Sequence, residues 1–154
     1  EEDKPCIAPA TALGIMKLID EAHVDVRNMS AGVVGSDLFT KPLKHLLRER
    51  GVTTERLDPN APDLAQKAAV KDILIPVVGR PGLITPEMLK DGAIVIDVGT
   101  TRVNGHLEGD VDPEGLEQKT GWLTPVPGGV GPMTVAMLLV NVLKAYHLQH
   151  HSKA

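Results

Sequence analysis

Apolar and polar positions along the chain alternate between two periods, one typical of helices and one typical of strands. Apolar residues at helical spacing, together with capping residues, predict helices at 11–23, 42–50, 63–70, 85–92, from 112 and at 133–148. Apolar runs of strand length predict strands at 31–35, 52–57, 73–78, 93–98 and near Trp122. Strands that alternate with helices predict an α/β fold with a doubly wound, mainly parallel sheet and helices on both faces.

The predicted strands differ in how they fit a buried sheet. Residues 93–98 are apolar except for Asp97, which indicates burial on both faces, whereas the polar strand 52–57 is expected towards an edge. Pro76 conflicts with the strand at 73–78, because proline has no N–H for the sheet ladder. We therefore expect a bulge or a free edge at Pro76.

Composition narrows the function classes. A chain of 154 residues with 42% hydrophobic and 23% charged residues fits one globular domain over 1–154. A net charge of −4 and 2% aromatic residues argue against nucleic acid as a partner, and the apolar runs are too short for a membrane span. A lone cysteine, Cys6, fits a reducing compartment such as the cytoplasm or the mitochondrial matrix. The first residue is not Met, which fits either a piece of a longer protein or a removed tag.

Ligands of a doubly wound sheet bind beyond the carboxyl ends of its strands. The loops expected there are 35–40, 57–62, 79–82 and 99–102. They supply the cofactor-binding candidates Gly35, Ser36, Asp58, Gly79, Gly99 and Thr100. The first loop has one glycine, so the phosphate-binding G-x-G-x-x-G pattern is incomplete and a plain strand-to-helix turn is an equal alternative.

A loop rich in proline and glycine, LTPVPGGVGPMT at 123–134, stands before the last helix. Its prolines fix the backbone and its glycines let a ligand approach the main chain. Pro132 is expected at the first helical position, where free N–H groups would face an anion. An ordinary strand-to-helix connection is the alternative.

Three segments carry a family resemblance. The segment PVPGGVGPMT at 125–134, within a longer match at 109–139, resembles the C-terminal half of methylenetetrahydrofolate dehydrogenase/methenyltetrahydrofolate cyclohydrolase, and 91–99 and 9–14 are similar to further signatures of that family. The resemblance implies a Rossmann-type domain that binds NAD or NADP. It also implies oxidation of 5,10-methylenetetrahydrofolate by hydride transfer, with hydrolysis of the methenyl product in many members.

The resemblance assigns roles to several residues. It implies that Thr11, Gly35, Gly99, Gly131 and Thr134 contact the cofactor, while the substrate-binding candidates are Pro127, Gly128 and Gly129. The sequence departs from the family pattern in three places, one of them at 57–60, where LDPN stands in place of a His/Ser segment that the family often has. Ser36 replaces an arginine in a segment that is one residue shorter and lacks the second glycine, and Thr100 and Thr101 replace Ile and Asn.

Asp58 bears on the choice of cofactor. It follows the second strand about twenty residues after the glycine turn, where an acidic side chain can accept from a ribose 2′-OH and would repel a 2′-phosphate. NAD is therefore slightly favoured over NADP. The alternative for Asp58 is an Asx turn with Pro59.

We expect no catalytic residue in this chain. In the resembled family the N-terminal domain supplies the catalytic lysine and the folate-binding aspartate, so the chain alone should be inactive. The expected partners are a folate substrate, through that missing domain, and a second copy of the chain in a homodimer. No metal site is expected, because the histidines at 147, 150 and 151 fit a polar tail. The alternative function is a non-catalytic Rossmann-like binding or assembly module whose cofactor site has decayed.

Overall fold

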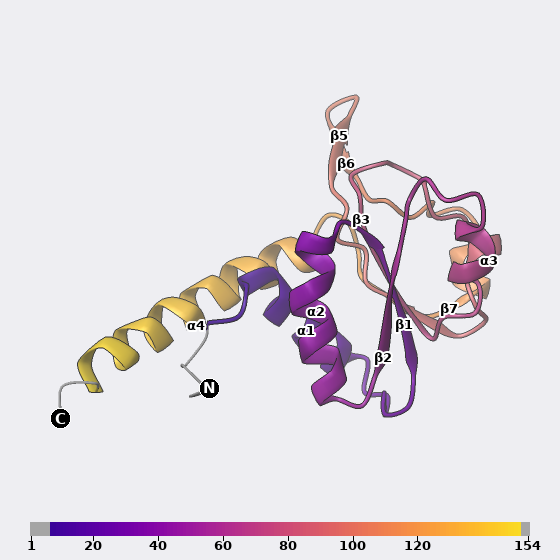
Figure 1. The fold of residues 1–154 in the computed structure, drawn as a ribbon. Coiled ribbons are helices and arrows are strands. Elements are labelled where there is room, and N and C mark those ends of the chain that lie inside the picture. The colour runs from indigo at the N-terminus through magenta and orange to yellow at the C-terminus, as the bar shows by residue number, and fades with distance from the viewer. Residues whose placement is uncertain (1–6, 152–154) are drawn as a thin grey trace.

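A computed structural model describes residues 7–151, which fold around a five-stranded parallel sheet (Figure 1). The strand order is β2-β1-β3-β4-β7. The strands are β1 (Ser30–Gly35), β2 (Thr53–Leu57), β3 (Ile73–Val77), β4 (Ala93–Val95) and β7 (Thr120–Leu123). The predicted α/β class is confirmed, and the polar strand β2 lies at an edge of the sheet, as expected.

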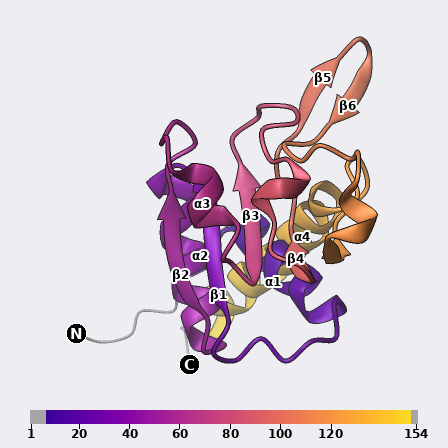
Figure 2. The ribbon, with the colours of Figure 1, turned by 90° about the vertical axis from the view of Figure 1, so that its right-hand side faces the viewer.

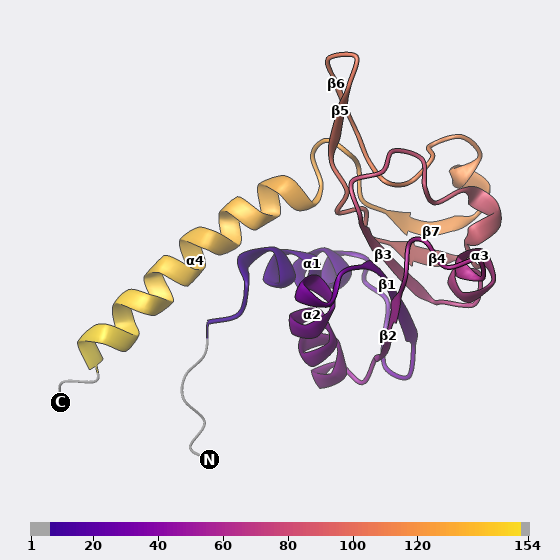
Figure 3. The same cartoon turned by 45° about the horizontal axis from the view of Figure 1, so that its top comes forward.

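Helices cover both faces of the sheet, with the long ones on one face (Figures 1 and 3). That face carries α1 (Ala10–Glu21), α2 (Asp37–Glu49) and α4 (Val130–His151). The other face carries α3 (Leu64–Ala68) and the short 3-10 helices η1 (Pro86–Met88) and η2 (Leu116–Gln118). Successive strand residues point to opposite faces, so Val33 and Val34 belong to two separate apolar cores.

Helix α2 begins at Asp37, five residues before the predicted start at Pro42. Pro42 is therefore the sixth residue of α2 and lies inside the helix. Local hydrogen bonds support the early start, because the Thr40 N–H and hydroxyl both donate to the Ser36 carbonyl. The expected loop at 35–40 is therefore only a short turn at Gly35 and Ser36.

Pro76 lies in a central strand and pairs with β1 without a bulge, but the ladder to β4 ends two residues earlier, at Leu74, so the strand has a free edge locally on that side. Strand β3 pairs with both β1 and β4, and the Pro76 carbonyl accepts a hydrogen bond from the Val98 N–H. The missing N–H of Pro76 faces the same side, towards β4. Regular strand structure in β4 ends at Val95, short of the predicted end at Val98, so the N–H that proline lacks falls beyond the paired part of β3 and β4.

Three further helix boundaries differ from the predictions. The helix expected at 85–92 is one 3-10 turn, η1, and the helix expected from Asp112 starts at Leu116 as η2. Helix α4 starts at Val130 and not at Met133, so Pro132 is its third residue. Proline is tolerated there because the first N–H groups of a helix have no intrahelical partner.

A hairpin projects from the end of the sheet to which the strand arrows point (Figure 2). Strands β5 (Thr101–Val103) and β6 (His106–Glu108) pair in antiparallel fashion through a turn at Asn104 and Gly105, both with positive φ. Asn-Gly is a preferred residue pair for two-residue turns of this kind.

The described residues contain neither a membrane-spanning helix nor a cluster of metal-binding side chains. Within residues 7–151 no helix has the length and apolar character that crossing a bilayer requires. The same residues contain no group of three or more His, Cys, Asp or Glu side chains arranged to hold a metal ion. Cys6 lies outside the described residues.

Candidate functional site

The turn after β1 lies where the carboxyl ends of the parallel strands meet, here called the carboxyl edge of the sheet. It joins the end of β1 to the start of helix α2. Gly35 is buried and pairs with Val77 of the neighbouring strand β3. Ser36 is exposed and is the N-cap residue of α2, although its side chain makes no capping hydrogen bond. The first turn of α2 also carries the acidic residue Asp37. The helix terminus therefore faces solvent beside an acidic side chain.

Arg56 joins this turn to the edge strand β2. Its Nη1 donates to the Gly35 carbonyl oxygen at 2.9 Å, and its Nε lies 3.1 Å from Asp37 Oδ1. The Asp37 carboxylate thus has a cation beside it. Because both side chains are more than one third exposed, this pair contributes little to stability.

The loop after β2 contains the Asx turn that was the alternative role for Asp58. Asp58 is exposed, and its Oδ1 accepts from the Asn60 N–H at 2.9 Å. The Asn60 side-chain oxygen in turn accepts from Arg80 Nη1 at 2.8 Å, which links this loop to the one after β3.

The loop after β3 is held by one buried carboxylate. Asp110 is fully buried, and its two oxygens accept from the N–H groups of Val78 at 2.6 Å, Gly79 at 3.2 Å and Arg80 at 2.7 Å. The Gly79 N–H is therefore engaged by the protein itself. Gly79 presents only its Cα and carbonyl to a ligand.

A second buried carboxylate, Asp97, holds the loop after β4. Its Oδ1 accepts from the N–H groups of Gly99 at 3.0 Å and Asp110 at 3.1 Å, and its Oδ2 accepts from the Val111 N–H at 3.0 Å. Its own N–H donates to the Thr124 hydroxyl at 2.8 Å. Burial raises the pKa of Asp97 to about 6, against the lowering effect of these hydrogen bonds.

The Pro/Gly loop passes from β7 into α4 along the same edge. Pro127 and Gly128 are exposed and follow a cis peptide bond, whereas Gly129 is buried. A Cβ on Gly129 would lie 2.6 Å from the Pro125 carbonyl oxygen, so a side chain there would force this loop open. The backbone of the loop is thus closely packed on itself, and its exposed part faces outward.

Packing of α4 against α1 places Thr134 near Thr11. The Thr134 hydroxyl donates to the Val130 carbonyl at 2.9 Å within the first turns of α4. The backbone at Thr134 packs against Gly14 of α1, one turn after the half-buried Thr11. Gly131 and Thr100 are exposed, the latter directly before the hairpin strand β5.

A cleft of about 720 Å³ lies beside these loops and not among the predicted residues. It runs between the hairpin, η2 and the beginning of the Pro/Gly loop, with apolar walls that include Leu107, Leu116 and Val126. None of the cofactor or substrate candidates lines this cleft. The predicted residues instead cluster on strand ends and helix beginnings.

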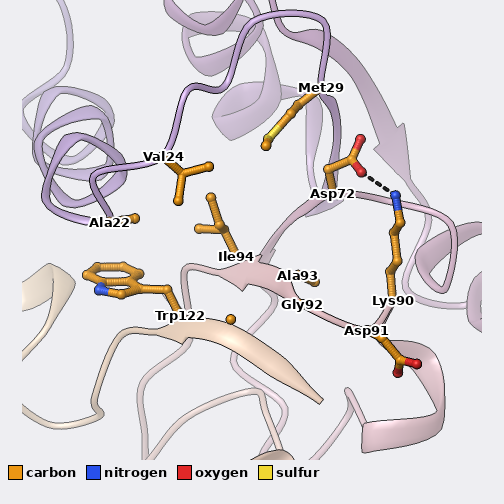
Figure 4. A pocket seen from close by; sticks show the side chains of 11 residues that line it. Ala22, Val24, Met29, Asp72, Lys90, Asp91, Gly92, Ala93, Ile94 and Trp122 are labelled. Carbon is orange, nitrogen blue, oxygen red and sulfur yellow. Dashed lines mark hydrogen bonds and ion pairs between the residues drawn. The ribbon is translucent and has the colours of Figure 1, made fainter.

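The opposite, amino edge of the sheet holds a smaller pocket of about 160 Å³ (Figure 4). Met29, Ile94 and Trp122 contribute apolar side chains to it, and Lys90 forms an ion pair with Asp72 at its rim. None of the predicted site residues lies in this pocket.

Sequence reasoning did not include Asp97 and Asp110 among the site residues. Only the bond from the Gly99 N–H to Asp97 is a local turn bond, whereas the bonds to Asp110 come from residues about thirty positions away. The sequence shows only the local position of each aspartate. Asp97 ends an apolar run, and Asp110 lies between Gly109 and Val111 after the hairpin. Neither position shows that the two carboxylates meet in the fold.

The parallel sheet covered by helices on both faces, with loops gathered at its carboxyl edge, defines a Rossmann-type α/β domain. A family model described as the tetrahydrofolate dehydrogenase/cyclohydrolase NAD(P)-binding domain matches residues 9–150. The chain belongs to this family, which confirms the family resemblance.

Curated relatives agree with the family match. The bifunctional protein FolD of Halothermothrix orenii is 50% identical over 140 residues, which cover 89% of this chain and 50% of the relative. FolD of Lactobacillus delbrueckii is 43% identical over 97% of this chain and 53% of its own length. The chain therefore spans about half the length of the curated relatives it matches.

A solved structure shows the same fold. The methylenetetrahydrofolate dehydrogenase-cyclohydrolase (FolD) of Trypanosoma brucei, complexed with NADP and an inhibitor, superimposes with a TM-score of 0.87 at 36% identity. The match covers 99% of this chain and 54% of the solved chain.

Proposed function

We propose that the chain is the nucleotide-binding half of a folate one-carbon enzyme. In this proposal the enzyme oxidises 5,10-methylenetetrahydrofolate by hydride transfer to NAD(P) and hydrolyses the methenyl product. The family match over residues 9–150 carries the proposal, because it places the whole described fold in an NAD(P)-binding family. The NADP complex of the Trypanosoma brucei relative supports the cofactor class.

The dinucleotide would lie across the carboxyl edge of the sheet, as it does in doubly wound folds generally. Gly35 and Ser36 would meet the pyrophosphate at the start of α2, and Gly79, Gly99 and Thr100 follow the next two strands. The Pro/Gly loop would meet the nicotinamide and the folate through Pro127, Gly128 and Gly129, with Gly131 and Thr134 on the cofactor side. The cofactor supplies the hydride acceptor, and this chain's residues bind and orient it.

Asp58 supports a preference for NAD over NADP. Its carboxylate is exposed beyond β2, where it would accept from a ribose 2′-OH and repel a 2′-phosphate. The Asx turn with Asn60 fixes the direction of the carboxylate without burying it. Arg56 and Arg80, the nearby cations, are engaged with Asp37 and Asn60 respectively, which reduces their availability to a 2′-phosphate.

Calorimetric titration of the purified chain with NAD and NADP tests this part of the proposal. We expect saturable binding of both, tighter for NAD, and Asp58→Ala should remove the difference between them. Asp91→Ala is a matched control, because Asp91 is an exposed carboxylate on the amino edge. Tighter binding of NADP than of NAD by the wild-type chain would contradict the preference.

The exposed face of α4 supports the requirement for a second domain. One side of the helix packs towards α1, with Val130 buried and Asn141 donating to the Ala8 carbonyl at 2.8 Å. The opposite side carries a stripe of apolar side chains at helical spacing, each more than half exposed: Val135, Leu138, Leu139, Val142, Leu143 and Tyr146. Figures 1 and 3 show this helix extending away from the sheet. Such a stripe is typical of an interaction surface.

We propose that the domain supplying the folate chemistry covers this apolar stripe, and that the chain alone has no activity. The part of the Halothermothrix orenii relative outside the match, produced separately, is the test partner. Mixing it with the chain should give a complex and methylenetetrahydrofolate oxidation, and Leu139→Asp in α4 should abolish both. Oxidation by the chain alone would contradict the proposal. Self-association of the chain through the same stripe would instead support a homodimer.

A non-catalytic binding or assembly module is the second candidate function. The turn at Gly35 and Ser36 favours it, since the turn has one glycine and leads into a helix whose first residue is Asp37. An acidic first turn disfavours a pyrophosphate, although the cation of Arg56 beside Asp37 offsets part of this effect. Absence of NAD and NADP binding would favour this second function.

A further inference from the structure

We propose that Asp110 and Asp97 are positioning residues of the nucleotide site, which hold the loops after β3 and β4 in the conformation that receives the cofactor. The proposal rests on the proposed function, since it concerns the same edge of the sheet. It adds two residues that sequence reasoning did not include in the site.

The first observation is the set of donors. Each carboxylate accepts from three backbone N–H groups, those of Val78, Gly79 and Arg80 for Asp110 and those of Gly99, Asp110 and Val111 for Asp97. All of the hydrogen bonds described for these two carboxylates come from the backbone. They therefore fix loop conformation directly and do not act through another side chain.

The second observation is that the bonds form one continuous path. The Thr124 hydroxyl accepts from the Asp97 N–H, the Asp97 carboxylate accepts from the Asp110 N–H, and the Asp110 carboxylate accepts from the 78–80 backbone. The path begins at the Pro/Gly loop and ends after β3. It thus joins loops that carry candidates for both the cofactor and the substrate.

The third observation is close packing around both carboxylates. A Cβ on Gly99 would overlap the Asp110 carboxyl group, and a Cβ on Gly109 would overlap the Asp97 carboxyl group. Asp110 is fully buried and Asp97 is 3% exposed. Because the two glycines have no side chain, the loop backbone packs directly against the carboxylates. The loops therefore have no room to move inward.

A carboxylate is required because both of its oxygens accept hydrogen bonds. Asp110 Oδ1 takes the Arg80 N–H, and Oδ2 takes those of Val78 and Gly79. In an asparagine one of these positions becomes an NH₂ group, which can only donate. Either orientation of the amide would face at least one N–H group and push that part of the loop away.

The loop that Asp110 holds meets the cores only at its first residue, Val78, which is partly buried against the second core. Gly79 and Arg80 are exposed, and neither belongs to the two apolar clusters. Releasing them should change the shape of the nucleotide edge more than it disrupts the packing of the domain. A loss of cofactor binding that exceeds the loss of stability would therefore distinguish a positioning role from a purely structural one.

The test compares Asp110→Asn with Asp112→Asn in the 154-residue chain. Asp112 is a matched control, because its Oδ1 accepts only a local turn bond from the Glu114 N–H two residues on. Calorimetric titration with NAD and NADP is run for each variant well below its own unfolding temperature. We expect cofactor binding about ten- to a hundredfold weaker for Asp110→Asn. In this variant the loop conformation that receives the cofactor leaves a buried N–H without an acceptor, and binding must offset the free-energy cost of that conformation. Binding by Asp112→Asn should be unchanged.

Thr124→Val provides a milder variant if Asp110→Asn does not fold. It removes the acceptor of the Asp97 N–H and keeps the shape of the side chain, so a smaller loss of affinity is expected. An unchanged affinity in folded Asp110→Asn or, failing that, in Thr124→Val would overturn the proposal, even if the unfolding temperature falls.

Amide hydrogen exchange separates this proposal from the proposed function. If the wild-type chain binds neither NAD nor NADP, the proposed function fails and positioning of a cofactor fails with it. Faster exchange at Val78, Gly79 and Arg80 in Asp110→Asn would then show that the carboxylate holds the loop without serving that cofactor. If the wild type binds and the variant exchanges and binds as the wild type does, only the positioning proposal is overturned.

Discussion

The two edges of the sheet hold carboxylates in opposite electrostatic surroundings. At the carboxyl edge Asp97 is buried among backbone N–H groups, and burial raises its pKa to about 6. At the amino edge Asp72 pairs with Lys90 and accepts from Ser30, and these hydrogen bonds, the one from Lys90 above all, lower its pKa to about 2. Figure 4 shows the Lys90 side chain reaching Asp72.

The difference indicates what each edge does for the protein. A carboxylate beside a cation stabilises the folded state at neutral pH, and the amino edge contains a second such pair, Lys119 with Asp91. A buried carboxylate without a cation costs stability when ionised. Asp97 is therefore expected to be retained for the loop conformation that it imposes, because its charge does not stabilise the fold.

The largest expected effect is the loss of stability when a methyl group is added at Gly99 of the carboxyl edge, compared with the same change at Gly92 of the amino edge. Gly99→Ala places a Cβ on the Asp110 carboxyl group, and we expect it to destabilise the chain by at least ~3 kcal/mol. Gly92→Ala at the amino edge meets no atom within 4 Å, so only its positive φ opposes the change, at about 1 kcal/mol. Urea unfolding of both variants measures the difference. Equal losses would break the contrast between the edges.

The next effect is the pH dependence of Asp97. Its pKa in the folded protein, about 6, lies above the ordinary value of 3.8, so the folded state binds more protons between these values. The contribution of Asp97 to stability therefore falls as pH rises from about 4 to about 6 and is constant above that.

Denaturant unfolding of wild type and Asp97→Asn from pH 4 to 7 isolates this contribution. The free energy of unfolding of the wild type minus that of the variant should fall by about 2–3 kcal/mol across the interval, following the linkage between pKa and stability. A difference that rises with pH, or stays constant, would show that Asp97 is not a desolvated carboxylate.

Asp72 should show the opposite sign and a smaller effect. Because its pKa is lowered to about 2, its stabilisation is present above pH 4 and is lost as pH falls from about 4 to about 2. At pH 7 we expect Asp72→Asn to cost about 1 kcal/mol after solvent screening. Thermal unfolding at pH 7 and pH 2 measures it. The same cost at both pH values would contradict the ion-pair account.

The smallest effect is expected for Asp91, whose side chain is 82% exposed in its pair with Lys119. Such surface pairs contribute roughly 0–0.5 kcal/mol, so Asp91→Asn should unfold with the wild type within that range. Unfolding in 1 M salt gives the control, since screening should remove any remaining difference. A cost as large as that of Asp72→Asn would show that exposure does not determine the strength of these pairs.

The order and type of most elements could be predicted from local sequence. Apolar patterns and their flanking residues located β1, β2, β3, α1 and α3, although β2 is largely polar and β3 contains Pro76. The differences involve proline. The sequence predicts a helix start at Pro42 and a bulge or a free edge at Pro76, yet both prolines lie inside their elements.

The site could be predicted only in outline. The topology rule placed Gly35, Asp58, Gly79 and Gly99 at one edge, and the fold brings their strand ends there. The bond from Asp110 to the 78–80 backbone spans about thirty residues, and no local pattern encodes a contact of that separation. The carboxylates that shape the loops are therefore visible only in the folded chain.

Calorimetric titration of the 154-residue chain with NAD and with NADP tests the central claim most directly. The account predicts saturable binding of both cofactors, tighter for NAD and about ten- to a hundredfold weaker in Asp110→Asn. No heat of binding from either cofactor at millimolar concentration would contradict a working nucleotide site in this chain and favour a non-catalytic module.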